Sequence, residues 1–206
     1  MEDKFGPEYS ISVYDPELEL RGFLVIDSTK LGTGKGGIRM TADLTLTEVR
    51  RLARTMTWKN ALAGLPFGGA KAGIVWKGGS ARRKKTLIQA FARKIKMFTP
   101  KYYIAGPDVN TGEKEMAWFV AATLNRRSAT GKPRRLGGLP HELGSTGFGV
   151  AHAARLAAAL RGIAIEGATV AIDGFGNVGR FAFKFLEKFG ARIVAVADSR
   201  GGAFRA

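Results

Sequence analysis

The sequence contains no cysteine and only two histidines, His141 and His152. Without thiols, a disulfide framework, a cysteine nucleophile and a thiolate metal site are all excluded. With two imidazoles we expect no histidine-rich metal centre, and no metal is predicted. No apolar run approaches the roughly 20 residues that a membrane-spanning helix needs. The first four residues, Met1–Lys4, do not resemble a signal peptide. We therefore expect a cytoplasmic protein that makes no membrane contact.

Acidic residues are also scarce, since 17 Asp and Glu stand against 33 Lys and Arg in 206 residues, a formal net charge of +16. Residues 80–135 contain 14 of the basic residues and only three acidic ones. Such a surplus raises nucleic-acid binding as a hypothesis. However, no aromatic residues interleave with the basic ones and no known binding module accompanies them. We interpret the segment as a solvated basic face and regard nucleic-acid binding as the weaker alternative.

The sequence does contain alternating strand-like and helix-like segments, which predict an α/β fold. Strands are expected where apolar residues alternate or form short runs: 10–14, 17–26, 74–76, 102–105, 168–172 and 192–197. Helices are expected where apolar residues recur every three or four positions: 46–63, 81–99, 112–124, 147–160 and 181–189. Glycine-rich loops are expected at 32–37 and 64–73. Ser80 is expected to cap the second helix.

One lysine is predicted to lie on the buried face of a helix. The first predicted helix begins with Thr45 and Glu48, which together have the spacing of a capping box. Lys59 follows Leu52 by seven residues and Met56 by three, so we expect it on the same apolar face. An unpaired buried charge is costly. Lys59 is therefore expected to meet an anionic partner.

A segment rich in glycine and proline, residues 131–140, predicts a boundary between two domains, 1–140 and 141–206. The second domain carries a glycine motif between a predicted strand and a predicted helix, made of Gly174, Phe175, Gly176, Asn177, Val178 and Gly179. In that context the motif is typical of a dinucleotide-binding turn. The first glycine allows a tight turn, the second lets the backbone approach a pyrophosphate, and the third permits helix–strand packing.

The residue that would meet the adenine ribose is Asp198, 19 residues after Gly179 at the end of the next strand. A carboxylate there accepts a hydrogen bond from a ribose 2′-hydroxyl and repels a 2′-phosphate, which favours NAD. Arg200 lies two residues further on, so NADP is kept as the alternative.

Five segments resemble the amino-acid dehydrogenase family that acts on glutamate, leucine, phenylalanine and valine. They are GKGGIRM, TMTWKNALAGLPFGGAKAG, GPDVNTGEKEMAW, GSTGFGV and GFGNVG, in the order and spacing of the family. The pattern is most similar to the glutamate dehydrogenases. The resemblance implies an N-terminal α/β domain for substrate binding and oligomerisation, followed by a Rossmann-like nucleotide-binding domain. It also implies a homo-oligomer, commonly a hexamer.

By the same resemblance, Lys71 is the catalytic lysine, which activates the water that attacks an iminium. Asp108 exchanges protons with the amino group of the substrate. Lys59 binds the α-carboxylate, and Lys35, with Gly36 and Gly37, binds the side-chain carboxylate. Thr146 lies near substrate and nicotinamide.

The implied reaction is the reversible NAD(P)-dependent oxidative deamination of L-glutamate to 2-oxoglutarate and ammonia. One alternative is a leucine- or phenylalanine-type enzyme, although the resemblance implies that enzymes of that type carry an apolar residue at the position of Lys35. Another is a non-catalytic homologue that binds only substrate or a sister subunit. Family members continue well over a hundred residues beyond the position of Ala206. We therefore expect an incomplete, C-terminally truncated Rossmann-like domain with two strands, in which helix 181–189 has little to cover it.

Overall fold

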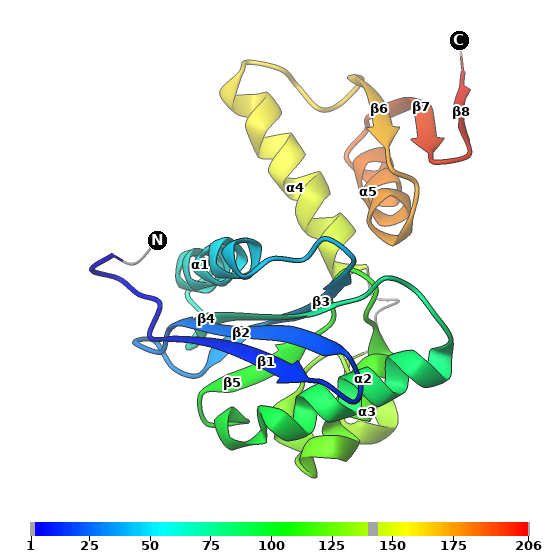
Figure 1. Cartoon of the computed structure of the whole chain (residues 1–206). Helices are drawn as coiled ribbons and strands as arrows, with labels where there is room; N and C mark the ends of the chain where they lie inside the picture. The colour runs from blue at the N-terminus through cyan, green and yellow to red at the C-terminus, as the bar shows by residue number, and fades with distance from the viewer. Residues whose placement is uncertain (1–2, 140–143, 206) are drawn as a thin grey trace. The chain divides into compact units, whose positions relative to one another are not determined.

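The computed structural model describes residues 3–139 and 144–205 of the chain. The chain divides into two compact units, Met1–Pro140 and His141–Ala206 (Figure 1). Both units combine helices with sheets that contain parallel strands, which confirms the predicted α/β class. Within the described ranges, no helix has both the length and the apolar character needed to cross a membrane.

The first unit is built on a five-stranded sheet in the order β1-β2-β4-β3-β5. Its strands are β1 (Tyr9–Asp15), β2 (Leu20–Ser28), β3 (Gly34–Thr41), β4 (Gly68–Val75) and β5 (Tyr103–Gly106). Neighbours β1, β2 and β4 pair antiparallel, whereas β3 runs parallel to both β4 and β5. The parallel pairs require helical crossovers, because a tight hairpin cannot connect parallel strands.

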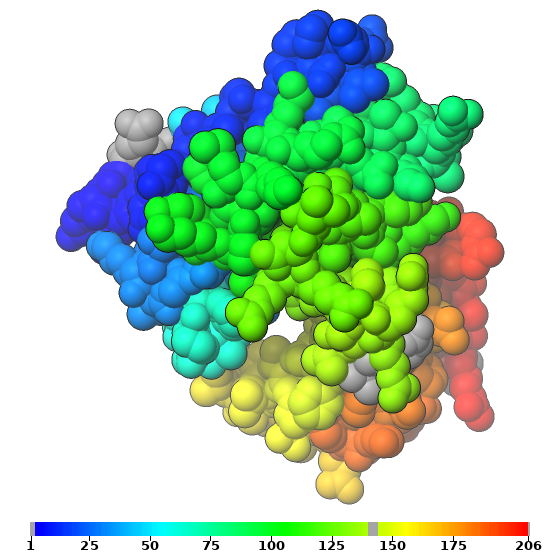
Figure 2. Space-filling view, turned by 90° about the horizontal axis from the view of Figure 1, so that it is seen from below, coloured from blue at the N-terminus to red at the C-terminus, as the bar shows by residue number. Residues whose placement is uncertain are grey.

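Helices cover both faces of this sheet. On one face, α1 (Leu46–Leu62) packs mainly on β4 and β2 (Figure 1). On the other lie α2 (Ala81–Lys94) and α3 (Glu113–Thr123). Short 3-10 turns follow these helices, at Lys96–Phe98, Arg126–Ser128 and Arg134–Leu136. Figure 2 looks onto the face formed by α2, α3 and the residues after them, which lie side by side.

The larger apolar core lies between the sheet and helices α2 and α3. It includes Ile38 and Met40 from β3, and Ala70, Ala72 and Ile74 from β4. Since successive strand residues point to opposite faces, the residues between them point toward α1. A smaller core lies on that side, formed by Val25, Leu44, Val49 and Ala53.

The predicted starts of α1 and α2 are confirmed, whereas one helix end and two loops differ from the predictions. The helices predicted at 147–160 and 181–189 begin earlier, at Ser145 and Asn177. The Thr45 hydroxyl accepts from the backbone N–H of Glu48, and Ser80 caps α2 in the same way. However, α2 ends at Lys94 and a 3-10 turn follows, so the predicted end near Pro100 is wrong. The predicted loops at 32–37 and 64–73 are also wrong in part, because strands β3 and β4 begin inside them.

The second unit contains α4 (Ser145–Leu160), α5 (Asn177–Lys188) and a three-stranded sheet. The strands are β6 (Thr169–Asp173), β7 (Arg192–Asp198) and β8 (Gly201–Phe204). β6 and β7 are parallel, and β8 returns antiparallel to β7. The expectation of two strands is therefore wrong, because a short turn after Asp198 sends the chain back along β7.

The expectation that the Phe-rich helix α5 has little cover is also wrong. Helix α4 packs along it, with the rings of Phe148 and Phe185 5.0 Å apart and those of His152 and Phe189 4.9 Å apart. The approach is close at Gly147, where an added Cβ would lie 2.4 Å from the Cβ of Phe181. The small residues of α4 therefore allow α5 to pack closely against it.

Candidate functional site

On the α1 side of the first sheet, helix cover is uneven. Helix α1 packs on β4 and β2 and reaches β3 only weakly (Figure 1). Three basic side chains point to this side: Lys35 and Arg39 from β3, and Lys71 from β4. The sheet therefore presents a group of cations beside the edge of α1.

Lys71 and Asp108 form the centre of the group. The Lys71 side chain is buried, with 5% of the residue exposed, and its Nζ donates to Oδ1 of Asp108 at 2.8 Å. Arg39 occupies the other oxygen, with Nε donating to Oδ2 at 2.7 Å. Arg39 also reaches α1, where Nη1 donates to Oε1 of Glu48 at 2.6 Å. Four side chains from β3, β4, α1 and the loop after β5 thus form one ionic network.

The loop that carries Asp108 is tied back onto β3. The Asp108 backbone N–H donates to the Thr111 hydroxyl at 2.8 Å, and that hydroxyl donates to the carbonyl of Ile38 at 2.7 Å. Asn110, in the left-handed region at φ 59°, donates its side-chain amide to the carbonyl of Met40 at 2.9 Å. These bonds fix the backbone of the loop, so the Asp108 carboxylate is held beside the strand pair.

Gly36 and Gly37 permit this close assembly. A Cβ on Gly37 would lie 2.6 Å from the carbonyl oxygen of Pro107, and one on Gly36 would lie 1.7 Å from that of Ala70. Any side chain at either position would push a neighbouring segment away. The Tyr103 hydroxyl, fully buried below, donates to the carbonyl of Gly36 at 3.0 Å. The structure gives the glycine pair a packing role, and substrate contact stays a prediction.

The electrostatics of the network favour an ionised Asp108. Burial acts to raise the pKa of Asp108, but hydrogen bonds from Lys71 and Arg39 lower it, and the resulting pKa lies below its usual value. The bond to Asp108 also raises the pKa of Arg39. At neutral pH, Asp108 is therefore an anion that accepts hydrogen bonds from Lys71 and Arg39.

Lys35 lies on the same side of the sheet but in different surroundings. Its Nζ is 4.2 Å from the centre of the Phe67 ring, a cation–π arrangement. Loss of surrounding water, and then the nearby charge of Lys132, lower the pKa of Lys35. Lys132 donates to the carbonyl of Ala129 at 2.7 Å. In the described part of the chain, no Asp or Glu forms an ion pair with Lys35.

The structure places Lys59 differently from the prediction. The buried residues of α1 are Val49, Ala53 and Asn60, and Lys59 is exposed, so its assignment to the buried face is wrong. The helix phase is set by polar contacts that hydrophobic periodicity does not register. Asn60 donates to the carbonyl of Gly68 at 2.7 Å, which turns its neighbour Lys59 outward. The role of Lys59 as a carboxylate ligand therefore depends on the family resemblance alone.

Two members of the network, Arg39 and Glu48, were not predicted. Arg39 lies inside the segment GKGGIRM, and the sequence predicts for Glu48 only a place in a helix cap. The available signal was spacing, because residues 35, 37 and 39 of a strand share one face. Assigning 32–37 to a loop concealed that face.

The glycine motif of the second unit forms a tight turn with open space at its second glycine. Gly174 adopts φ +96°, as the tight turn after β6 requires. A Cβ on Gly176 would meet nothing within 4 Å, whereas one on Gly179 would lie 1.9 Å from the carbonyl oxygen of Gly174. The second glycine is thus open to an approaching phosphate at the start of α5, and the third is needed for packing.

Asp198 ends β7 and borders a hollow of about 510 Å³ that also includes Phe175 and Arg200. Its carboxylate accepts from the backbone N–H of Arg200 at 2.8 Å and from Nη2 of Arg200 at 3.1 Å. Those bonds, the backbone one first, lower the pKa of Asp198. Thr146 is exposed in the first turn of α4. The residues present fit a nucleotide, and the Asp198–Arg200 pair offers groups for either ribose form.

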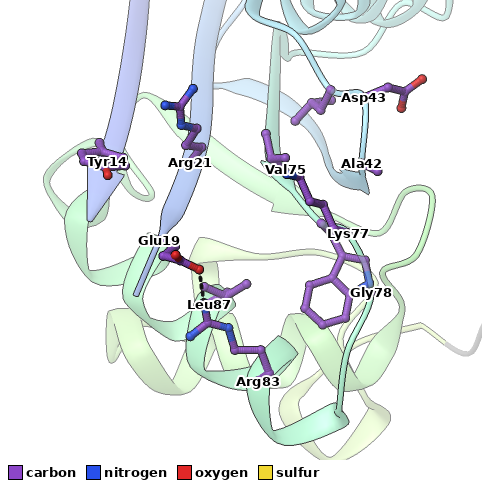
Figure 3. A pocket seen from close by; sticks show the side chains of 12 residues that line it. Tyr14, Glu19, Arg21, Ala42, Asp43, Val75, Lys77, Gly78, Arg83 and Leu87 are labelled. Carbon is purple, nitrogen blue, oxygen red and sulfur yellow. Dashed lines mark ion pairs between the residues drawn. The ribbon is translucent and has the colours of Figure 1, made fainter. Parts of the chain in front are cut away.

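A hollow of about 880 Å³ lies elsewhere in the first unit, past the carboxyl ends of β3 and β4 (Figure 3). It is lined by side chains of both charges, including Arg21, Asp43 and Lys77, with Glu19 and Arg83 4.0 Å apart. None of the predicted site residues lines it. We therefore do not assign the reaction to this hollow, although it is large.

Comparisons with known proteins agree with the geometry. The family model described as Glu/Leu/Phe/Val dehydrogenase, dimerisation domain, matches residues 8–125. A second, described as Glutamate/Leucine/Phenylalanine/Valine dehydrogenase, matches residues 137–206. The chain is 41% identical over 196 residues to a glutamate dehydrogenase of Aeropyrum pernix, covering 86% of this chain and 44% of that protein. It is 42% identical over 188 residues to an NADP-specific glutamate dehydrogenase of Saccharolobus shibatae, covering 85% and 44%.

Two solved structures are similar in fold. Glutamate dehydrogenase from Peptoniphilus asaccharolyticus aligns with a TM-score of 0.83 at 32% identity, over 97% of this chain and 56% of that one. The hetero-hexameric glutamate dehydrogenase from Thermus thermophilus, in its Leu-bound form, aligns with a TM-score of 0.79 at 31% identity, over 95% and 50%. The chain spans about half the length of the curated relatives it matches. By its two family matches and these likenesses, the chain belongs to the Glu/Leu/Phe/Val dehydrogenase family.

Proposed function

We propose that this chain acts in the reversible NAD(P)-dependent oxidative deamination of L-glutamate to 2-oxoglutarate and ammonia. The relatives that it matches at about 40% identity are named glutamate dehydrogenases. In this proposal the first unit is the substrate-binding and oligomerisation domain, and the second is part of the dinucleotide-binding domain.

The observation that carries the proposal is the contact between buried Lys71 and partly buried Asp108. Nζ and Oδ1 are 2.8 Å apart, so a proton can move between a base and an acid that are already in hydrogen-bond contact. In the proposed reaction, Asp108 takes a proton from the substrate amino group. Lys71, after giving up its own ammonium proton to solvent, takes a proton from the water that attacks the iminium carbon. Lys71 is buried and the Asp108 side chain is 19% exposed, so both groups are largely shielded from bulk solvent, which strengthens their effect on a bound substrate.

The charges of the site support a substrate that carries a side-chain carboxylate. Lys35, Arg39 and Lys71 carry three positive charges, against two negative charges on Asp108 and Glu48. Asp108 and Glu48 are both engaged by Arg39, which leaves Lys35 without a described acidic partner. A side-chain carboxylate would pair with Lys35 through a charge-assisted bond. Leucine or phenylalanine would leave Lys35 unpaired beside Phe67, so they should bind less well.

We propose that Lys59, Gly36, Gly37 and Thr146 complete the contacts to substrate, as the family resemblance implies. For the cofactor, the residues proposed to hold NAD(P) are Gly174, Phe175, Gly176, Asn177, Val178, Gly179 and Asp198. When bound, NAD(P) would accept the hydride from the α-carbon of glutamate. The open backbone at Gly176 supports this assignment. Curated relatives include both NAD-specific and NADP-specific enzymes, so either coenzyme is consistent with the family.

We also propose that the chain assembles as a homo-oligomer, a hexamer by family resemblance, in the cytoplasm. Strand β1 supports this, because it is an edge strand that pairs only with β2 among the described strands. An unpaired edge can accept a strand or a side chain from another subunit. A structural relative is described as hetero-hexameric, which is a statement about that protein.

Calorimetric titration of the 206-residue chain with two 2-oxo acids tests the substrate assignment. We expect 2-oxoglutarate to bind more tightly than 4-methyl-2-oxopentanoate, its counterpart from leucine. Tighter binding of the apolar acid would instead support a leucine-type site. Glutamate and NAD(P) are then combined, and the absorbance of the reduced nicotinamide is followed. Binding of 2-oxoglutarate by well-folded protein without turnover would support the alternative of a non-catalytic homologue.

A further inference from the structure

The Asp108 carboxylate is held by two cations, and only one of them has a proposed catalytic role. Lys71 contacts Oδ1 at 2.8 Å, and Arg39 contacts Oδ2 at 2.7 Å. If Lys71 alone held Asp108, the carboxylate could rotate whenever Lys71 turned to substrate or water. The second contact removes that freedom, because the plane of the carboxylate is fixed from its far side.

Arg39 is itself held at two points. Its Nε donates to Asp108, and its Nη1 donates to Glu48 at 2.6 Å. A guanidinium is planar, so two bonds from different nitrogens to separate carboxylates determine its orientation. A lysine has a single nitrogen at the end of a flexible chain and could not reproduce this bridge.

Glu48 is a rigid anchor because it belongs to the first turn of α1. Its backbone N–H donates to the capping hydroxyl of Thr45 at 3.2 Å, which fixes the start of the helix. A carboxylate is also favoured there by the positive end of the helix dipole. The two ion pairs, Glu48 with Arg39 and Arg39 with Asp108, therefore link the start of α1 to the loop after β5.

We propose that Arg39, anchored by Glu48, is a positioning residue that fixes one oxygen of Asp108 and so presents the other to Lys71. This inference rests on the proposed function, since it assigns Asp108 the role of proton carrier. It goes further in naming what sets the orientation and proton affinity of that carboxylate.

The groups facing Asp108 come from every element around it. Lys71 faces it from β4 and Arg39 from β3, with Glu48 of α1 behind Arg39. On β5, Tyr103 is buried, and burial, then the charge of Asp108, raise its pKa well above the usual value. Among the described residues, loss of Arg39 would leave Lys71 as the one cation bonded to Asp108, so the carboxylate should take up a proton more readily.

The test is a carbon-13 NMR titration of the Asp108 side-chain carboxyl in the full 206-residue chain, with Asp108→Asn used to assign the signal. In Arg39→Gln, we expect the titration midpoint of Asp108 to rise by about one unit or more. In Arg39→Lys, which keeps the charge but loses the bridge, we also expect a rise. Arg82→Gln removes one charge from an exposed position on α2 and should leave the midpoint unchanged.

An Asp108 midpoint that equals the native value in either folded Arg39 variant would overturn the proposal. If Arg39→Gln does not fold, as judged by circular dichroism, Arg39→Lys alone decides. The titration uses neither substrate nor NAD(P), so its result is independent of the proposed function. Glutamate binding can fail while the Asp108 midpoint shifts, and the midpoint can stay unchanged while glutamate binds.

Discussion

At the scale of single residues, Lys71 is a buried lysine inside strand β4, with glycines on either side of it in the same strand. Glycines normally weaken strands, and here they occur because neighbouring backbones approach too closely for a Cβ. Such tertiary constraints involve residues distant in sequence, so local propensity could not predict them.

Lys71→Met should abolish most turnover in any active assembly. The change removes the amine proposed to activate water while keeping most of the length of the side chain, and a positioned acid–base group contributes about 100-fold or more to rate. Steady-state rates of glutamate oxidation measure the effect, with circular dichroism to show that the fold is intact. Lys77→Met, at an exposed position just past β4, is the matched control. A turnover rate in Lys71→Met within twofold of the native rate would remove Lys71 from the catalytic assignment.

Lys35→Leu should weaken 2-oxoglutarate binding roughly tenfold to a hundredfold, the equivalent of one hydrogen bond to a charged group. Binding of 4-methyl-2-oxopentanoate should improve, because the half-buried ammonium that lacks a described acidic partner is gone. Calorimetry on native protein, Lys35→Leu and the exposed control Lys30→Leu measures both ligands. If Lys35→Leu keeps the native preference, the side-chain carboxylate binds elsewhere.

At the scale of elements, helix α1 shows what periodicity predicts and what it misses. The start at Thr45 was predicted because a cap is a local signal. The rotation of the helix about its axis was not, because a buried polar cluster determines it. Asp27, 2% exposed, accepts from Arg54 at 2.8 Å and from the Thr57 hydroxyl at 2.6 Å. Hydrophobic spacing treats all of these residues as outward-facing.

Gly69→Ala should loosen the contact between α1 and the sheet. The new Cβ would lie 2.1 Å from Thr57 Oγ1 and 2.2 Å from the Thr57 backbone nitrogen, so the helix must shift. We expect a loss of about 1–3 kcal/mol in the free energy of unfolding of the first unit, as for other overpacked sites. Urea unfolding followed by circular dichroism gives this value.

The control for that experiment is Gly149→Ala in α4, where a Cβ would meet nothing within 4 Å. Alanine favours helix over glycine, so this variant should not destabilise the protein. An unfolding curve for Gly69→Ala that coincides with the native one would show that α1 does not depend on close packing at Gly69.

At the scale of the whole molecule, the order of strands and helices was accessible from sequence because each element has a local pattern. Strand β8 was missed, since Gly201–Phe204 is short and its pairing with β7 is determined by the turn at Asp198 and Arg200. The basic segment 80–135 was recognised from composition. The ion pairs made by its lysines could not be predicted, because the acidic partners lie on other helices and strands. Lys94 pairs with Asp15 at 3.2 Å, and Lys84 pairs with Glu115 at 3.2 Å.

The basic segment 80–135, which includes α2 and α3 on the face shown in Figure 2, should bind nucleic acid only through general charge attraction. Part of its charge is already paired within the fold. Fluorescence anisotropy with a labelled DNA duplex should show binding that falls steeply with salt and is lost at ~150 mM, because counterion release dominates such association. Tight binding at that salt, with a shallow salt dependence, would support a specific nucleic-acid partner.

Stability at acidic pH reports on the ion pairs of the first unit. The folded-state pKa of Asp108 lies below the usual 3.8, and that of Asp3 is lowered to about 2, mainly by its bond to Arg54. A lowered pKa means that the unfolded chain binds more protons over this range, so stability falls as pH falls. The contribution is complete above the unfolded pKa near 3.8 and is lost as pH falls through the lower folded-state pKa of each group, which for Asp3 is about 2.

We therefore expect the free energy of unfolding to decline between about pH 5 and pH 2. In Asp108→Asn the decline should be shallower, because the carboxylate that must be protonated is absent. Urea titrations at a series of pH values measure the slope, with Asp43→Asn, at an exposed carboxylate, as the control. If Asp108→Asn retains the native slope, the carboxylate has the same proton affinity in the folded and unfolded chain. The Lys71 and Arg39 contacts would then not hold it as an ion.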